Sequence, residues 1–224
     1  MLPKSVRIVE VGPRDGLQNE KQALAVETKI ALIEALADAG VSTIESGSFV
    51  NPKWVPQMAN SDEVLAGLRR KSGINYAVLI PNMQGFTRAV EAQADELAVF
   101  TAASETFSQK NTNCSTAETL KRFEPVLEAA KSKGLPIRAY VSCALGCPYE
   151  GDIDPQKVLD LSRELLAMGC YEVSISDTIG IAGAGDCKRM LDVVCSELPV
   201  SKLAVHYPDT YGQALANILQ SLQM

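Results

Sequence analysis

Short apolar runs rich in β-branched residues alternate with helical patterns from one end of the chain to the other. A strand needs only a few such residues, whereas an amphipathic helix repeats its apolar positions about every 3.6 residues. Seven strands are predicted in this way, at Val6–Val11, Thr43–Ser46, Tyr76–Ile80, Leu97–Thr101, Ile137–Ser142, Glu172–Ser176 and Leu203–His206. Strands that alternate with helices are typical of a parallel sheet covered by helices.

The segments between the strands carry start and stop signals for helices. Ser115–Glu118 has the form of a capping box, and Asp154-Pro155 places a capping residue before a proline at the first helical position. Glycine often ends a helix because it adopts positive φ without strain. Four glycines are therefore expected to close helices: Gly40, Gly73, Gly134 and Gly169.

The distribution of polar residues favours one of the two folds that fit this alternation. Nearly every predicted strand ends in residues able to do chemistry, namely Arg14 and Asp15, Glu45, Asn82, Ser104 or Glu105, Ser142, Asp177, and His206. Barrel enzymes collect their sites from the carboxyl ends of many strands, whereas doubly wound sheets bind ligands at one switch point. We therefore predict a TIM (β/α)8-type barrel with about seven β/α units present, as a single, incomplete domain over residues 1–224.

Composition narrows the class of protein further. The 224 residues are 46% hydrophobic and 21% charged, which is ordinary for a globular protein. A net charge of −6, without any extended Lys/Arg run, argues against a nucleic-acid partner. The longest apolar run falls short of a membrane span, and the first strand begins too early for a targeting peptide, so a cytoplasmic location without membrane contact is expected. The six cysteines form no Cys-x-x-Cys motif and are expected to be reduced and packed.

The most informative segment is VEVGPRDGLQNE, residues 9–20. Arg14 and Asp15 bring a fixed cation and a hard oxygen ligand to the end of the first strand. Chemistry that stabilises an enolate beside a divalent metal needs this combination. The alternative is a surface turn, because Gly-Pro and Asp-Gly are turn formers and an Arg-Asp pair can be solvated. The segment alone leaves both interpretations open.

Four further stretches of the chain are also distinctive. SFVNPKWVPQM begins at Ser48, YVSCALGCPYEG at Tyr140, SDTIG at Ser176 and DTYGQALAN at Asp209. Together with VEVGPRDGLQNE, in this order and spacing, they resemble the hydroxymethylglutaryl-CoA lyase family of barrel-fold, metal-dependent lyases. The resemblance implies retro-Claisen cleavage of a CoA thioester, 3-hydroxy-3-methylglutaryl-CoA, to acetyl-CoA and acetoacetate. Related synthases share the Arg-Asp-Gly start but are not expected to share SFVNPKWVPQM.

The resemblance also implies roles for individual residues. Asp15 is similar to the carboxylate ligand of a divalent metal, Mg²⁺ or Mn²⁺, and Arg14 to the arginine that stabilises the enolate. Glu45 and Asp177 resemble carboxylates that support proton transfer, and His206 resembles a metal ligand with an acid/base role. Gln18 and Ser48, with Arg14, are expected to line the substrate pocket. For three of these residues a structural role is the alternative: a satisfied histidine at 206, a helix cap at Asp177 and an ion pair at Glu45.

Two departures from the family pattern affect the expected site. The family carries His-x-His after the seventh strand, where both imidazoles reach one ion, but this chain reads His206-Tyr207-Pro208. Proline offers no donor atom to a metal. The family also continues into an eighth strand, with an asparagine ligand and a loop that carries a catalytic cysteine. Two of four expected ligands, Asp15 and His206, are therefore predicted to remain.

These departures keep other interpretations open. The chain can be an active lyase, an inactive lyase-derived barrel that serves as a subunit, or another aldol/Claisen-type metallolyase. Strands Val6–Val11 and Leu203–His206 are expected to keep open edges, since a barrel removes its edges only by closure. We therefore expect a homo-oligomer or an aggregating chain rather than a monomer.

Overall fold

The computed structural model describes residues 2–224, which form two compact units. The amino-terminal unit comprises Val6–Val99 with Ser132–Pro136, and the carboxy-terminal unit comprises Phe100–Lys131 and Ile137–Met224 with residues 2–5. No helix in the described part of the chain combines the length and apolar character needed to cross a membrane. The expectation of one domain over 1–224 stays a prediction.

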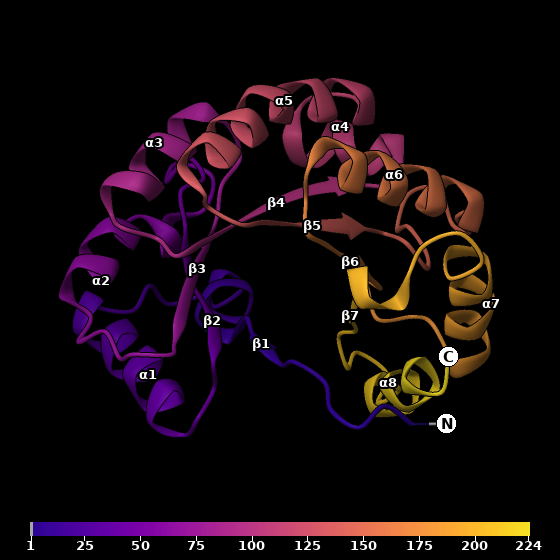
Figure 1. Cartoon of the computed structure of the whole chain (residues 1–224), viewed down its shortest axis with the longest axis horizontal. Helices are drawn as coiled ribbons and strands as arrows, with labels where there is room; N and C mark the ends of the chain where they lie inside the picture. The colour runs from indigo at the N-terminus through magenta and orange to yellow at the C-terminus, as the bar shows by residue number, and fades with distance from the viewer. Residues whose placement is uncertain (1) are drawn as a thin grey trace. The chain divides into compact units, whose positions relative to one another are not determined.

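The amino-terminal unit is built on parallel strands that neighbour each other in sequence order. These are β1 (Val9–Glu10), β2 (Thr43–Ser48), β3 (Asn75–Leu79) and the first part of β4 (Glu96–Ala102). Helices α1 (Val26–Asp38), α2 (Ser61–Gly67) and α3 (Met83–Glu91) connect successive strands and lie on one side of them (Figure 1). Two short helical turns complete the unit, η1 (Gly12–Gly16) and η2 (Pro56–Met58).

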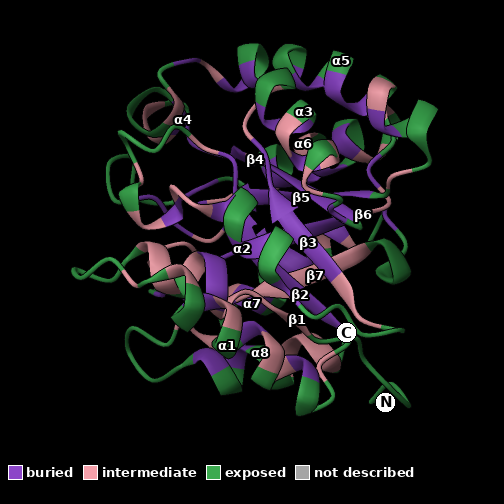
Figure 2. Cartoon of the chain, turned by 90° about the vertical axis from the view of Figure 1, so that its left-hand side faces the viewer, coloured by how far each residue is buried: buried purple, intermediate pink, exposed green. Residues whose placement is uncertain are grey.

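Apolar side chains at helical spacing on α1 explain the packing of this unit. Ile33 and Ala37 are buried against Ile44 of β2 and Tyr76 of β3, and Val64 and Leu68 join the same cluster. Burying a side chain such as Ile contributes about 1.5–3 kcal/mol. Figure 2 shows the result: the strands β2 and β3 are coloured as buried, and the helices are exposed on their outer turns.

The carboxy-terminal unit repeats the same arrangement. Its parallel strands are β5 (Ile137–Ser142), β6 (Glu172–Ser176) and β7 (Leu203–His206). The Ala103 N–H, just after β4, donates to the Ser142 carbonyl at the end of β5 over 2.9 Å. The remaining elements are α4 (Glu105–Thr112), α5 (Thr116–Lys133), α6 (Pro155–Met168), α7 (Ala184–Val194), η3 (Val200–Lys202) and α8 (Ala214–Leu222).

All seven predicted strands form, and two differ from the prediction in a way that matters for the site. β1 is reduced to Val9–Glu10, because only these residues pair with β2, while Val6 and Ile8 are 57% and 69% exposed. β2 runs on to Ser48, so the expectation that Glu45 ends its strand is wrong, and Glu45 lies inside it.

The predicted helix signals are mostly confirmed. The Ser115 N–H donates to Glu118 Oε2 over 2.7 Å and the Glu118 N–H returns a bond to Ser115 Oγ over 3.2 Å, which completes the capping box. Asp154 accepts the Gln156 N–H at the start of α6, and Gly169 ends that helix with φ of 115°. Gly40 and Gly134 also follow helices with positive φ. The prediction for Gly73 is wrong: α2 already ends at Gly67.

Gly180 and Gly212 allow a test of how tightly the loops after β6 and β7 are packed. Both have a φ near +67°, but a Cβ on Gly180 would lie 2.8 Å from the Pro208 carbonyl oxygen and against Thr210 Oγ1, whereas one on Gly212 meets nothing within 4 Å. We expect Gly212→Ala to lower the free energy of unfolding by about 1–2 kcal/mol, the cost of a left-handed L-residue. Gly180→Ala should cost roughly 1–3 kcal/mol more, the range for overpacking. Urea denaturation of both variants measures the difference, and equal losses would contradict it.

Candidate active site

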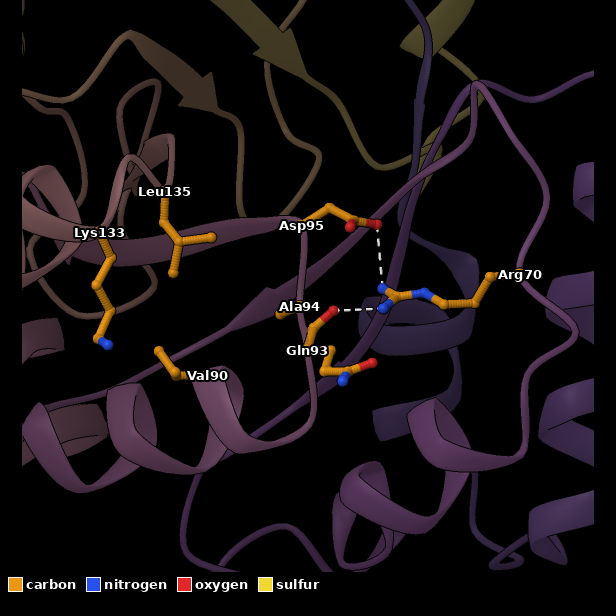
Figure 3. A pocket seen from close by; sticks show the side chains of 7 residues that line it. All are labelled: Arg70, Val90, Gln93, Ala94, Asp95, Lys133 and Leu135. Atoms are coloured by element: carbon orange, nitrogen blue, oxygen red, sulfur yellow. Dashed lines mark hydrogen bonds and ion pairs between the residues drawn. The ribbon is translucent and has the colours of Figure 1, made fainter.

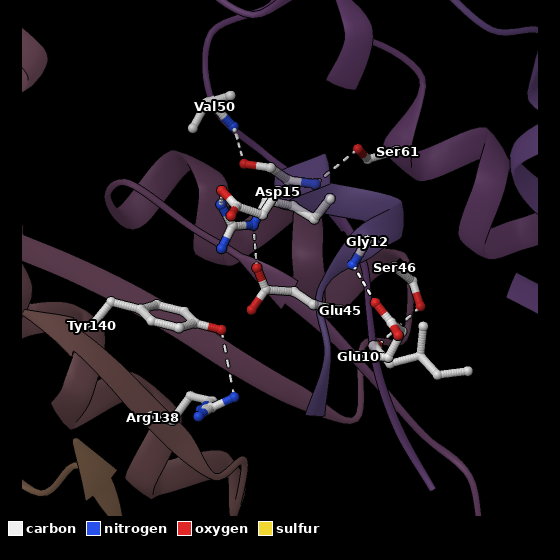
Figure 4. Close-up of polar contacts among 12 residues, drawn as sticks. Glu10, Gly12, Asp15, Glu45, Ser46, Val50, Ser61, Arg138 and Tyr140 are labelled. Carbon is white, nitrogen blue, oxygen red and sulfur yellow. Dashed lines mark hydrogen bonds and ion pairs between the residues drawn. The ribbon is translucent and has the colours of Figure 1, made fainter. Parts of the chain in front are cut away.

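The segment that carries Arg14 and Asp15 is a single wide helical turn, η1. The N–H groups of three successive residues, Arg14 to Gly16, converge on the Val11 carbonyl at 3.1, 2.7 and 3.5 Å. Helical turns widened in this way often occur at functional sites. The Glu10 carboxylate accepts the Gly12 N–H over 2.6 Å and so fixes the entry to the turn (Figure 4).

Arg14 lies buried between two carboxylates of the amino-terminal unit. Its side chain is only 9% exposed, its Nε donates to Glu45 Oε1, and its Nη1 donates to Asp15 Oδ1 over 2.8 Å. Glu45 is fully buried within β2, while the Asp15 side chain keeps about a third of its surface exposed. Desolvating a charge is expensive unless it is paired and hydrogen-bonded. The interpretation of Arg14-Asp15 as a solvated surface pair is therefore wrong.

The predicted pocket residues Gln18 and Ser48 lie in the same unit. Ser48 is buried at the end of β2, where its N–H donates to Ser61 Oγ over 3.0 Å and its Oγ accepts the Val50 N–H over 3.3 Å (Figure 4). Ser48 therefore shapes the loop that follows β2. Gln18 is half-buried, four residues after Arg14. Substrate binding by Gln18 and Ser48 stays a prediction.

His206 ends β7 in the carboxy-terminal unit, and the strand register shows which side chains share its face. Ser176 is paired with His206, Ser174 with Ala204 and Tyr140 with Ser174. Successive side chains of a strand point to opposite faces, and directly paired residues of neighbouring strands point to the same one. Tyr140, Ser174, Ser176 and His206 therefore line one polar face of β5, β6 and β7.

Asp177 follows β6 directly and belongs to the other face. Its N–H donates to the His206 carbonyl over 3.0 Å, which continues the ladder and places Asp177 opposite Tyr207. Its Oδ2 accepts the Ala182 N–H over 2.9 Å, while Oδ1 is buried without a hydrogen-bond partner in the described residues. Ala182, in turn, packs in one buried cluster with Tyr207. The carboxylate thus closes the loop from 177 to 182, and its predicted part in proton transfer stays a prediction.

The donors that the structure describes do not fit a complete metal site. Asp15 and His206 offer an oxygen and a nitrogen of suitable chemistry. Within residues 2–224, however, no three His, Cys, Asp or Glu side chains gather closely enough to hold an ion. Pro208 supplies no side-chain donor, and Asp209 Oδ1 accepts the Ala214 N–H over 3.0 Å, as expected for a cap of α8. The chemistry below is therefore derived without a metal step.

Cys143 and Cys147 are both buried in the loop after β5, where the Cys147 Sγ also contacts Ser104 Oγ over 3.0 Å. Burial raises the pKa of the Cys143 thiol to about 12, so this thiol stays protonated at neutral pH. Cys143 has a φ of 56°, and its N–H donates to Thr178 Oγ1 over 2.7 Å. Five of the six cysteines are buried, Cys195 is partly so, and all six are free thiols, which agrees with their expected role in packing.

A hollow of about 460 Å³ lies in the amino-terminal unit, away from the carboxyl ends of the strands (Figure 3). Arg70 closes one side of it, with Nη2 bonded to Asp95 over 3.1 Å and Nη1 to the Gln93 carbonyl. Asp95 directly precedes β4, so the hollow belongs to the amino end of the sheet. Barrel enzymes place their chemistry at the opposite end. We therefore do not assign the active site to this hollow.

Three further residues, which were not predicted from the sequence, position the candidate site. Glu10 fixes the Arg14 turn, Thr178 ties the loops after β5 and β6 together, and Asn217 of α8 donates its Nδ2 to the Ala182 carbonyl over 2.8 Å. Asn217 carries a readable signal, because a polar residue three positions after Ala214 falls on the buried face of a helix. Glu10 and Thr178 act on backbone N–H groups, which leaves no such pattern.

Three comparisons place these features among known proteins. A 3-hydroxy-3-isohexenylglutaryl-CoA/hydroxymethylglutaryl-CoA lyase of Pseudomonas aeruginosa is 59% identical over 99% of this chain and 74% of its own length. The human mitochondrial hydroxymethylglutaryl-CoA lyase is 56% identical over the whole of this chain and 69% of the human protein. The crystal structure of a P. aeruginosa hydroxymethylglutaryl-CoA lyase superposes with a TM-score of 0.96, at 59% identity over 99% of this chain and 74% of that one.

A more distant structure shows how far the similarity extends. A hydroxymethylglutaryl-CoA lyase of Acinetobacter baumannii, in complex with coenzyme A and 3-methylmalate, is 36% identical with a TM-score of 0.93, over 100% of this chain and 73% of that one. The HMGL-like family model matches residues 5–224. The predicted TIM-barrel class is thereby confirmed, with seven parallel strands, and the chain belongs to the HMGL-like family of carbon–carbon lyases.

Proposed function

We propose that this chain carries the chemistry of a hydroxymethylglutaryl-CoA lyase, the cleavage of 3-hydroxy-3-methylglutaryl-CoA to acetyl-CoA and acetoacetate. The observation that supports it most is the buried Arg14, held by Glu45 and Asp15 in a turn that the family pattern assigns to the reaction. The names of the relatives agree with this substrate. A small-molecule CoA thioester is therefore the proposed substrate.

The reaction requires two proton transfers and a place for negative charge. A base takes the proton from the hydroxyl of the branched carbon, the adjacent carbon–carbon bond breaks, and acetoacetate leaves. The electron pair of that bond becomes the enolate of acetyl-CoA, which then takes up a proton. We assign the stabilisation of the enolate to Arg14, because a buried cationic donor acts most strongly where charge develops. Glu45, Asp177 and His206 are the proposed proton-handling residues, and Gln18 and Ser48 the proposed pocket residues.

A divalent ion, Mg²⁺ or Mn²⁺, is part of this proposal as a weakly held cofactor. Such an ion polarises oxygen atoms of a substrate when bound. Asp15 and His206 are the proposed donors, and the described residues supply no complete set around them. A cytoplasmic location is likewise a proposal, since the curated relatives include both mitochondrial and cytoplasmic proteins.

Pro208 favours a second candidate function. A chain in which proline replaces a metal-binding histidine can persist as an inactive, lyase-derived subunit. The deciding experiment is a coupled assay of acetoacetate release from 3-hydroxy-3-methylglutaryl-CoA, with Mg²⁺ and with a chelator. Release that the chelator abolishes supports the lyase. Its absence at high protein concentration, with a folded chain, supports the inactive subunit.

Arg14 should be indispensable for the activity of an active chain. We expect Arg14→Ala to lower kcat about 10²–10³-fold, the usual loss when one charge-stabilising donor is removed. Arg14→Lys should not restore turnover, because an ammonium cannot bond both carboxylates with the planar fork of arginine. Steady-state kinetics measures both variants, with Arg163→Lys, an exposed ion pair partner of Glu197, as the control. Unchanged turnover in Arg14→Ala would remove Arg14 from the mechanism.

Binding of Mn²⁺ should be weak and should depend on Asp15. With two proposed protein donors, water must fill most positions around the ion. We expect calorimetric titration to give a weak Kd for the wild type and no detectable binding for Asp15→Ala. Pro208→His should tighten binding, since it restores a donor two positions from His206. Tight binding that survives Asp15→Ala would show that the ligand assignment is wrong.

The proposed homo-oligomer has a candidate surface on α8. Leu215 is 80% exposed and Leu219 is 50% exposed, one turn apart on the same face of the helix. Burying such side chains between two copies of this chain would stabilise a dimer. We expect the mass from light scattering at micromolar concentration to exceed that of a monomer, and Leu215→Glu with Leu219→Glu to lower it. A wild type that is monodisperse as a monomer would contradict the proposal.

A further inference from the structure

Helix α8 contacts two segments next to His206 through side-chain hydrogen bonds, one of them buried and one partly buried. Asn217, only 1% exposed, donates Nδ2 to the Ala182 carbonyl over 2.8 Å. One turn later, the Ser221 hydroxyl shares a 2.9 Å hydrogen bond with the Tyr207 hydroxyl. Tyr207 follows His206 directly in the sequence. The same face of α8 therefore contacts Tyr207, the neighbour of His206, and the loop between β6 and α7.

The bond from Asn217 to Ala182 is connected to His206 through Asp177. Ala182 receives a bond on each side of its peptide: its carbonyl accepts from Asn217, and its N–H donates to Asp177 Oδ2 over 2.9 Å. The N–H of Asp177 then donates to the His206 carbonyl over 3.0 Å. Three hydrogen bonds thus join the side chain of Asn217 to the backbone of His206, all within the carboxy-terminal unit.

Packing alone does not account for an asparagine at this place. Ala182, Cys187, Tyr207 and Ala214 form a buried, largely apolar cluster, and Asn217 bonds the carbonyl of one member. A buried amide is costly unless its polar atoms are bonded, yet Asn217 Oδ1 has no partner in the described residues. A residue that satisfies only part of its hydrogen-bonding capacity stabilises the fold less than a well-packed apolar side chain. The bond that its donor group makes, to the Ala182 carbonyl, therefore points to a role in holding this loop.

We propose that Asn217 is a positioning residue, which sets the backbone of His206 through Ala182 and Asp177. The proposal deepens the proposed function, because it rests on His206 taking part in the reaction. Asn217 itself touches no substrate in this account. Its donor fixes the loop from 177 to 182, and the loop fixes the residue that ends β7.

The single histidine of the chain makes the proposal directly measurable. The imidazole C2–H gives one resolved proton NMR signal, which reports the surroundings of His206 in the folded protein without any substrate. We expect Asn217→Leu and Asn217→Asp, which both lack the amide donor, to shift and broaden this signal. Asp177→Ala, which removes the next bond of the series, should change it in the same way. Asp177→Asn should leave it in place, since its amide oxygen can still accept the Ala182 N–H.

Gln220→Leu is the matched control, because it removes an amide from the same helix, where Gln220 contacts Met224 and not the loop. Steady-state kinetics supplies the second readout. The Asn217 variants should have a kcat roughly ten- to a hundredfold lower, because a small misplacement of a catalytic group slows the reaction by about that much. Their KM should change by less than about threefold. If Asn217→Leu does not fold, Asn217→Ser tests the same bond, because its hydroxyl is too short to reach Ala182.

The outcomes separate the two proposals. A wild type without acetoacetate release overturns the proposed function, and the NMR comparison still decides on Asn217. An unmoved His206 signal in folded Asn217→Leu, Asn217→Asp and Asp177→Ala overturns the positioning role, whatever the activity. A shift in Gln220→Leu equal to that in the Asn217 variants would also overturn it, since any change in α8 would then have the same effect.

Discussion

A buried guanidinium is the constraint around which the amino-terminal unit is organised. Arg14 cannot stay desolvated without negative partners, and Glu45 and Asp15 provide them. Removing one partner of such a pair typically costs 3–5 kcal/mol, because the other charge is then left buried without compensation. The need to pair this charge agrees with the register of β2, in which Glu45 faces the turn. It also agrees with the wide turn η1, in which Arg14 and Asp15 bond each other. The fold thereby keeps a guanidinium, its charge offset by two carboxylates, at a place that water barely reaches.

In the carboxy-terminal unit, hydrogen bonds between loops hold the ends of the strands. Thr178 accepts from Cys143, and Asp177 bonds both His206 and Ala182. Cys143 is held in the left-handed region, where a non-glycine residue is strained and persists only when its surroundings fix it. Such a network suits a site in which an imidazole must keep its orientation, because each loop limits the movement of the next.

The sequence predicts the architecture of this chain better than the detail of its site. Periodicity identifies every strand, and the capping residues Ser115 and Asp154 mark helix starts, since these signals are local. Glu45 and Asp177 show where local signals fail. The longer β2 places Glu45 inside a strand, and the register of β6 turns Asp177 away from the face of His206. Both outcomes depend on which residues pair across strands, and a single sequence does not contain that information in a readable pattern.

Pro208 can be understood in the same physical terms. Residues i and i+2 of an extended chain point to one side, so a side chain at 208 lies on the side of His206, where the proposed metal site would need a second donor. The proline keeps the chain extended there, as it restricts the residue before it, and Tyr207 is buried against α7 and α8 in consequence. Asp209 still caps the start of α8. The end of β7 therefore keeps its order around Pro208, with the His206 carbonyl bonded to Asp177 and Tyr207 buried. What proline lacks at this place is a side-chain donor, so under the proposed function the affinity for a metal depends on what water can supply.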